Sequence, residues 1–67
     1  MKTEAAIITA QVLGTVAFNK GRSAVPAHDP ELLKVIEKHE IKEMGACIPI
    51  LKAWLASWHA ANLAKAV

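Results

Sequence analysis

Apolar positions in the first third of the chain recur at intervals of three and four residues, as on one face of an α-helix. Ala6, Ala10 and Gly14 form a ridge of small residues on this segment, flanked by bulky isoleucine and valine side chains. A ridge of this kind lets another helix approach closely. Gly21 suits a helix C-terminus, because glycine tolerates the left-handed conformation found there. The pattern predicts a helix over about residues 4–20.

The next periodic segment starts at Asp29 and Pro30, which suit the N-cap and the first helical position. Apolar residues follow at helical spacing on one face: Leu32, Leu33, Val35, Ile36, Ile41 and Met44. The other face is charged and is interpreted as solvated: Lys34, Glu37, Lys38, Glu40, Lys42 and Glu43. With Gly45 as the stop signal, the pattern predicts a helix over about residues 30–44.

A third segment opens at Pro49, again suited to a first helical position, and predicts a helix over about residues 49–66. One face of this helix is bulky: Leu51, Trp54, Leu55 and Trp58. The opposite face is small: Ala53, Ala56, Ala60 and Ala64. Trp54 and Trp58 are four residues apart and therefore form one ridge, which can fill a large share of a small core.

Together these segments predict an all-α fold, a small bundle of about three helices in a single domain covering residues 1–67. A chain this short buries only about 60% of its unfolded surface. Its one cysteine, Cys47, cannot form an internal disulfide.

Hydrophobic residues nevertheless make up 54% of the chain, more than one small core hides. The small-residue ridge of the first helix and the alanine face of the third carry no charge, so each can serve as a second apolar face. We therefore expect a homo-oligomer, with a two-fold dimer as the first expectation.

The net charge of +2 neither requires nor excludes a nucleic-acid partner. The longest uncharged run, residues 5–19, is shorter than the roughly 20 residues that a membrane-spanning helix needs. A lone cysteine fits a reducing compartment. We expect a cytoplasmic chain that does not insert into a membrane.

No group of side chains in the sequence has the spacing of a catalytic or metal site. The three histidines come from three segments, without a partner at metal-ligand spacing. Cys47 lies in no recognisable nucleophile motif and is interpreted as a small buried residue. No glycine-rich phosphate loop is present. The sequence predicts a protein that is not an enzyme and that needs no cofactor.

A small basic patch is a further hypothesis. Lys20 and Arg22 flank Gly21, and Lys52 and Lys65 add positive charge on the third segment. Phosphate binding needs several cations acting together, so four charges suit either a modest RNA contact or a plain solvated surface.

Two stretches, AFNKGRSAVPAHDP from Ala17 and KAWLASWHAA from Lys52, resemble the ribosome modulation factor family. The resemblance rests on residues at comparable positions: Phe18, Gly21, Pro26, Trp54, Trp58 and Ala61. Ser57 stands where a glycine is typical of the family. The resemblance implies a small helical protein that binds the ribosome and suppresses translation.

Two functions therefore stay open. The favoured one is a non-enzymatic helical interaction module of bacterial or phage origin, which binds and modulates a host protein. The alternative, which the family resemblance implies, is a translation modulator that binds the ribosome or its RNA. Phe18, Lys20, Gly21, Arg22, Trp54 and Trp58 are the candidate residues of an interaction or structural motif, and we expect the two tryptophans to be structural first.

Overall fold

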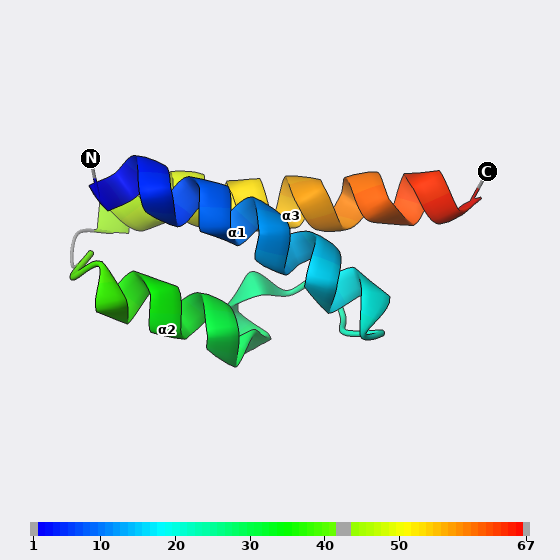
Figure 1. The fold of residues 1–67 in the computed structure, drawn as a ribbon, viewed down its shortest axis with the longest axis horizontal. Coiled ribbons are helices and arrows are strands. Elements are labelled where there is room, and N and C mark those ends of the chain that lie inside the picture. The colour runs from blue at the N-terminus through cyan, green and yellow to red at the C-terminus, as the bar shows by residue number, and fades with distance from the viewer. Residues whose placement is uncertain (1, 42–43, 67) are drawn as a thin grey trace.

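The computed structural model describes residues 2–41 and 44–66. Its elements, in chain order, are α1 (Lys2–Asn19), the short 3₁₀ helix η1 (Pro26–His28), α2 (Pro30–Lys38) and α3 (Met44–Ala66). α1 and α3 pack against each other and run in the same direction, and α2 lies to one side of this pair and runs in the opposite direction (Figure 1). The predicted all-α three-helix bundle is confirmed, and the described part of the chain contains no strand.

The C-terminus of α1 forms at the predicted place. Gly21 has a φ of 77°, in the left-handed region. Its N–H donates to the carbonyl of Phe18 at 3.0 Å, and the N–H of Arg22 donates to that of Ala17 at 2.9 Å. These two bonds make a Schellman motif, which satisfies carbonyls that the end of a helix leaves open.

The predicted N-terminus of α2 is also confirmed. The carboxylate of Asp29 accepts a hydrogen bond from the N–H of Glu31 at 3.0 Å, and Pro30 occupies the first turn. Asp29 thus caps α2 at the end where the helix dipole favours a negative charge.

The predicted end of this helix at residue 44 is wrong, because α2 ends at Lys38. Glu40 takes the left-handed conformation with a φ of 55°. The N–H groups of Glu40 and Ile41 donate to the carbonyls of Glu37 and Ile36, which repeats the Schellman pattern without a glycine. Residues 42–43 of the predicted helix lie outside the described residues.

The predicted stop at Gly45 and start at Pro49 are wrong as well, since α3 runs from Met44 through both residues. Pro49 lacks an N–H, so at this position it removes one hydrogen bond to the carbonyl of Gly45, close to the helix start. The extra turn contains Cys47, which is partly buried, and Ile50, which directly follows Pro49, is fully buried in the core.

The core lies between α1 and α3, with α2 adding a smaller contact against α1. The side of α1 that faces α3 is built of small residues, here called the inner ridge: Ala6, Ala10, Gly14 and Ala17. A methyl group on Gly14 would overlap the carbonyl oxygen of Trp54 and lie 3.1 Å from Cβ of Ser57. The ridge does admit a helix at close range, but that helix is α3 of the same chain. The ridge is therefore not the second face that was expected for a dimer.

Candidate functional site

The residues predicted to form the interaction motif meet near the C-terminal end of α1. Phe18 lies in the last turn of α1, and Lys20, Gly21 and Arg22 follow it. Trp54 and Trp58 reach the same region from α3 through the contacts described below. Two segments more than 30 positions apart are thus joined.

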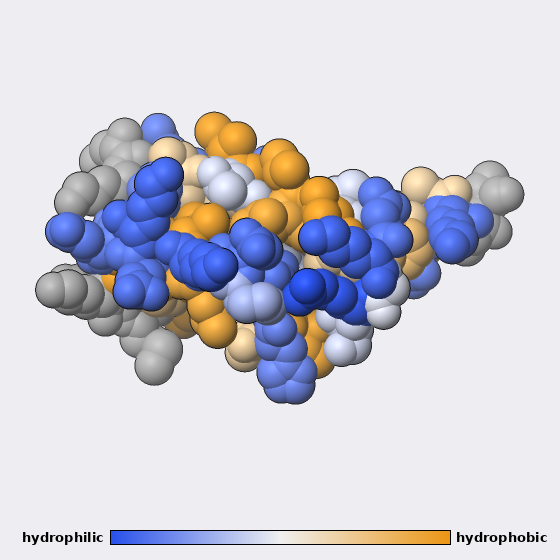
Figure 2. Space-filling model, turned by 60° about the horizontal axis from the view of Figure 1, so that its bottom comes forward, coloured by the Kyte–Doolittle hydropathy of each residue, from blue (hydrophilic) through white to orange (hydrophobic). Residues whose placement is uncertain are grey.

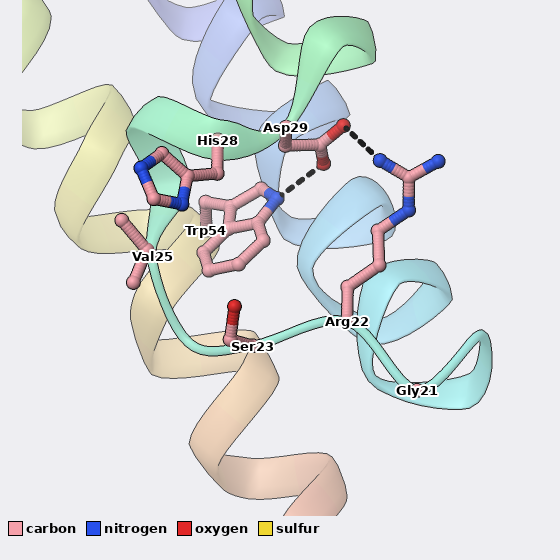
Figure 3. Close-up of a pocket in the computed structure, with 7 residues that line it drawn as sticks. All are labelled: Gly21, Arg22, Ser23, Val25, His28, Asp29 and Trp54. Carbon is pink, nitrogen blue, oxygen red and sulfur yellow. Dashed lines mark hydrogen bonds and ion pairs between the residues drawn. The ribbon is translucent and has the colours of Figure 1, made fainter.

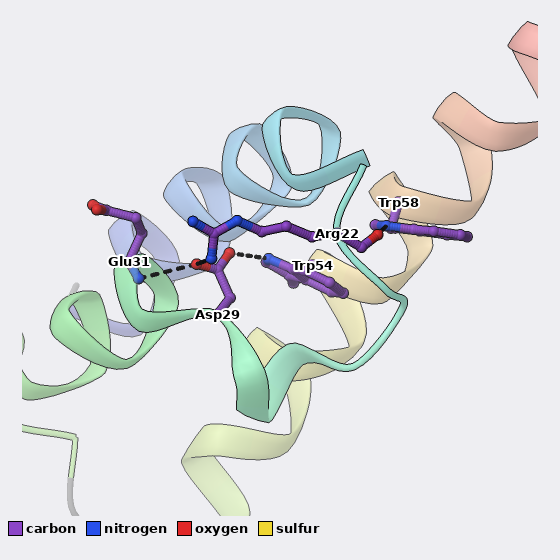
Figure 4. A network of polar contacts seen from close by, with 5 residues as sticks. All are labelled: Arg22, Asp29, Glu31, Trp54 and Trp58. Carbon is purple, nitrogen blue, oxygen red and sulfur yellow. Dashed lines mark hydrogen bonds and ion pairs between the residues drawn. The ribbon is translucent and has the colours of Figure 1, made fainter. Parts of the chain in front are cut away.

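Trp54 is the buried centre of this region. Its side chain is 0% exposed, and its indole N–H donates to Oδ2 of Asp29 at 2.8 Å (Figure 4). The other oxygen of the same carboxylate accepts the N–H of Glu31. One aspartate therefore connects α3 to the start of α2, and the only polar atom of the indole is satisfied inside the core.

Asp29 is itself almost fully buried, with 4% of its surface exposed. A buried carboxylate is costly unless it is paired and hydrogen-bonded. Besides accepting two N–H groups, Asp29 forms an ion pair with Arg22, with 3.9 Å between Oδ1 and Nη1. The Arg22 side chain remains 41% exposed. Arg22 thus offsets the buried charge from the surface side.

Trp58 lies at the rim of the core rather than inside it. Its ring meets Phe18 edge-to-face, with centroids 5.3 Å apart, and its N–H donates to the backbone carbonyl of Arg22 at 3.0 Å. The ring of the adjacent His59 meets Trp58 edge-to-face, and Nζ of Lys65 lies 5.8 Å from the centroid of Phe18. Trp58 therefore fastens the loop after α1 onto α3, and it leaves an aromatic and cationic surface outside.

A hollow of about 300 Å³ lies beside this network, between the loop and α3 (Figure 3). Its lining residues are Gly21, Arg22, Ser23, Val25, His28, Asp29 and Trp54. Because Trp54 is fully covered and both oxygens of Asp29 are engaged, a ligand here would meet chiefly Arg22, Ser23 and His28.

Residues 2–41 and 44–66 contain no group of three His, Cys, Asp or Glu side chains placed to hold a metal ion. Cys47 is partly buried, with its sulfur 3.9 Å from the carbonyl oxygen of Ile41. Among the described helices, none combines the length and the hydropathy needed to cross a membrane.

The surface that sequence reasoning did not single out is the outer side of α1. Four exposed residues form a row there, here called the outer stripe: Ala5, Ile8, Val12 and Val16. Ile8 is 63% exposed and Val12 is 59% exposed. In Figure 2, apolar surface runs along the upper edge, over α1, whereas the face formed by α2 is mostly hydrophilic. The stripe is therefore a surface that a partner can cover.

Two polar neighbours of the stripe form hydrogen bonds within their own helix. The hydroxyl of Thr9 donates to the carbonyl of Ala5 at 2.9 Å, and that of Thr15 donates to the carbonyl of Gln11 at 3.4 Å. Both threonines thus direct their hydroxyls to the backbone, and no charged residue lies between Glu4 and Lys20.

The stripe had a signal in the sequence, because its members are three, four and four residues apart. This spacing does not show which side of α1 is buried, because the inner ridge has the same period. On α3, the predicted alanine face is exposed at Ala56, Ala60 and Ala64, whereas Ala53 packs against the core.

Comparison of the chain with family models, with curated proteins and with solved structures gave no match. The resemblance to the ribosome modulation factor family therefore stays a prediction based on its two short segments.

Proposed function

We propose that this protein is a non-enzymatic helical interaction module that binds a protein through the outer stripe of α1. One observation carries the proposal: three large aliphatic side chains, Ile8, Val12 and Val16, stand exposed in a row on a helix without charge from residue 5 to 19. Single exposed apolar residues are ordinary on soluble proteins, but an uncharged row at helical spacing is typical of a docking surface.

The energetics favour such a role. Fully burying one valine or isoleucine side chain is worth about 1.5–3 kcal/mol relative to leaving it exposed. The stripe is also held in a fixed shape, since the opposite side of α1 packs at close range against α3. A partner would thus meet an ordered surface and lose little free energy in arranging it.

Site-specific crosslinking tests the proposal. A benzophenone side chain placed at Val12 is expected to capture a protein in cells that produce the chain, whereas the same group at Lys34 is not. Lys34 is a matched control because it is exposed on the charged side of α2. Equal capture at both positions, or none at Val12, would contradict a docking role for the stripe.

A second candidate function, binding to ribosomal RNA, is favoured by the aromatic and cationic end of the molecule. Lys65 lies over Phe18, Phe18 meets Trp58, and the side chain of Arg22 is partly exposed nearby. Cations beside aromatic rings suit phosphates and stacked bases. The carboxylate of Asp29, which is paired with Arg22, is buried.

Cosedimentation with ribosomes at low and high salt tests this alternative. RNA binding through Lys20 and Lys65 should weaken steeply as salt rises, and replacing both lysines with glutamine should weaken it further. Val12→Glu leaves these lysines in place and is the control. Binding that ignores salt and both lysines would contradict RNA contact at this end.

A further inference from the structure

We propose that the partner covering the outer stripe is a second copy of this chain, with the two α1 helices antiparallel about a two-fold axis at Val12. The inference rests on the proposed docking role of the stripe and names its occupant. Three properties of α1 carry it: the symmetry of the stripe, the placement of charge at its ends, and the closure of the resulting pair.

The stripe is nearly symmetric about Val12. Ile8 and Val16 lie four residues to either side of it, and Ala5 and Asn19 lie seven residues away. Steps of four and seven return to the same face of a helix. In an antiparallel pair centred on Val12, each of these residues lies level with its counterpart from the other copy. Ile8 then lies level with Val16, and the two Val12 side chains meet at the axis.

The flanking positions obey the same symmetry. Thr9 and Thr15 lie three residues from Val12, and both hydroxyls are bonded within their own helix. Neither position therefore brings an unsatisfied hydroxyl to the contact.

Charge selects the direction of pairing. Glu4, in the first turn of α1, and Lys20, just after its last turn, are both exposed and lie eight residues from Val12. An antiparallel pair brings the acidic end of one copy level with the basic end of the other. A parallel pair would instead bring Glu4 level with Glu4 and Lys20 level with Lys20. Opposed helix dipoles favour the antiparallel arrangement as well.

The other exposed apolar residues are less suited to self-pairing. Leu33, Ile48 and Leu63 are exposed large side chains, but they are not arranged in an uncharged row; Leu63 shares its face of α3 with Lys52 and His59. On α3, Ala56 and Ala60 offer single methyl groups, and the charged Lys52 and the polar His59 are exposed near them. On α1 the contact is made by larger side chains without a nearby charge. Two-fold pairing also covers the stripe on both copies, so the assembly stops at two chains.

The expected pair is weak. A stable interface commonly buries about 800 Å² on each partner. That is about a sixth of the 4568 Å² that one chain exposes, and one helical stripe supplies less than this amount. We therefore expect a dimer that forms in the micromolar range and dissociates on dilution.

Sedimentation equilibrium on the full chain tests the pairing surface. The apparent mass should rise from 7.2 kDa towards twice that value as concentration increases. Val12→Glu should weaken the dimer at least tenfold, because it buries two like charges at the axis. Ala60→Glu, an equal change on α3, should leave the dimer intact. If Ala60→Glu dissociates the dimer and Val12→Glu does not, the alanine face is the interface and the proposal is wrong.

Disulfide trapping tests the direction of pairing, with Cys47→Ala as the background. Disulfide-bonded Cα atoms are about 6 Å apart, whereas positions 5 and 19 are separated by about 21 Å along one helix. Val12→Cys should therefore crosslink with itself, and Ala5→Cys should crosslink only when mixed with Asn19→Cys. Self-crosslinking by Ala5→Cys alone would indicate a parallel pair and overturn the proposal.

A charge swap gives an independent measure. Glu4→Lys should weaken the dimer, and adding Lys20→Glu should restore it. A chain that stays at 7.2 kDa at every concentration would exclude self-pairing. If the crosslinker at Val12 then captured a different protein, the docking role of the stripe would stand without the dimer. If the crosslinker captured no protein at all, both the dimer and the docking role of the stripe would be contradicted.

Discussion

The two sides of α1 are equally uncharged but differ in residue size and in burial. The inner ridge is made of alanine and glycine and is buried against α3, whereas the outer stripe carries larger side chains such as Ile8 and Val12 and is exposed. Hydrophobicity alone would have placed the larger side chains inside. In this molecule the side chains of α3, above all Trp54, supply the volume of the core, and α1 supplies the small surface on which they close.

Close packing explains why this arrangement is favoured. With no side chain on Gly14, the backbones of α1 and α3 approach until the carbonyl of Trp54 lies against α1. Many atoms then reach contact distance, and each contact adds a small dispersion energy. A large side chain on this face would hold the helices apart and lose those contacts.

The strongest way to break the inner side is Gly14→Ala. The new methyl group would overlap the backbone of Trp54, which cannot move independently of α3. We expect the free energy of unfolding, measured in urea, to fall by about 3 kcal/mol or more. Gly45→Ala is the matched control: among the described residues, no atom outside its chain neighbours and the nearby helix backbone lies within 4 Å of the added methyl group. That change in α3 should stabilise the protein by about 0.5–1 kcal/mol. Equal effects of the two substitutions would argue against the close approach.

Trp54→Phe probes the side chain that fills the core opposite the inner ridge. Phenylalanine keeps an aromatic ring but leaves Oδ2 of the buried Asp29 without its donor. We expect a loss of about 2–3 kcal/mol in the free energy of unfolding.

A double-mutant cycle with Asp29→Ala isolates the contribution of this bond. The two substitutions should be coupled, so that the double variant loses less than the sum of the single ones. Strict additivity would mean that the indole and the carboxylate do not interact.

Trp58→Phe tests the rim of the same contact. It removes the hydrogen bond to the carbonyl of Arg22, but that bond is exposed, so water can take the place of the donor. We expect a loss of about 1 kcal/mol, smaller than at Trp54. Thermal unfolding followed by circular dichroism measures it, and a loss as large as that of Trp54→Phe would place Trp58 in the core.

The smallest effect is expected on the outer side. Val12→Ala removes an exposed side chain and should change the stability of the monomer by less than about 0.5 kcal/mol. The reciprocal change, Ala10→Val on the inner ridge, should cost about 1–3 kcal/mol because it enlarges a fully buried position. Both are measured by urea unfolding at a concentration below that of any dimer. A larger loss for Val12→Ala would reverse the assignment of the two sides.

Local signals in the sequence were sufficient for three helices and two of their ends. Asp29 followed by Pro30 starts α2, and Gly21 ends α1, because each depends only on residues within one turn.

Two other helix ends do not follow the local signals. Glu40 ends α2 in a conformation that usually marks a glycine, and its bonds are accompanied by Ile36 and Ile41 packing against the core. Pro49, a typical first residue, lies instead inside α3. In both cases contacts between distant parts of the chain outweigh the local preference. The residues near each helix end therefore do not predict where it lies.

The sequence also did not show which face of α1 is buried. Both sides of α1 repeat every three to four residues, so periodicity predicts a helix without saying which side is buried. The hydrogen bond between Trp54 and Asp29 joins residues 25 positions apart. In the sequence, Trp54 is explained as a core residue and Asp29 as a helix cap, so neither residue indicates the bond. Local chemistry determined where α1 and α2 form, and the fit between small and large surfaces determined how they pack, because that fit exists only once the helices meet.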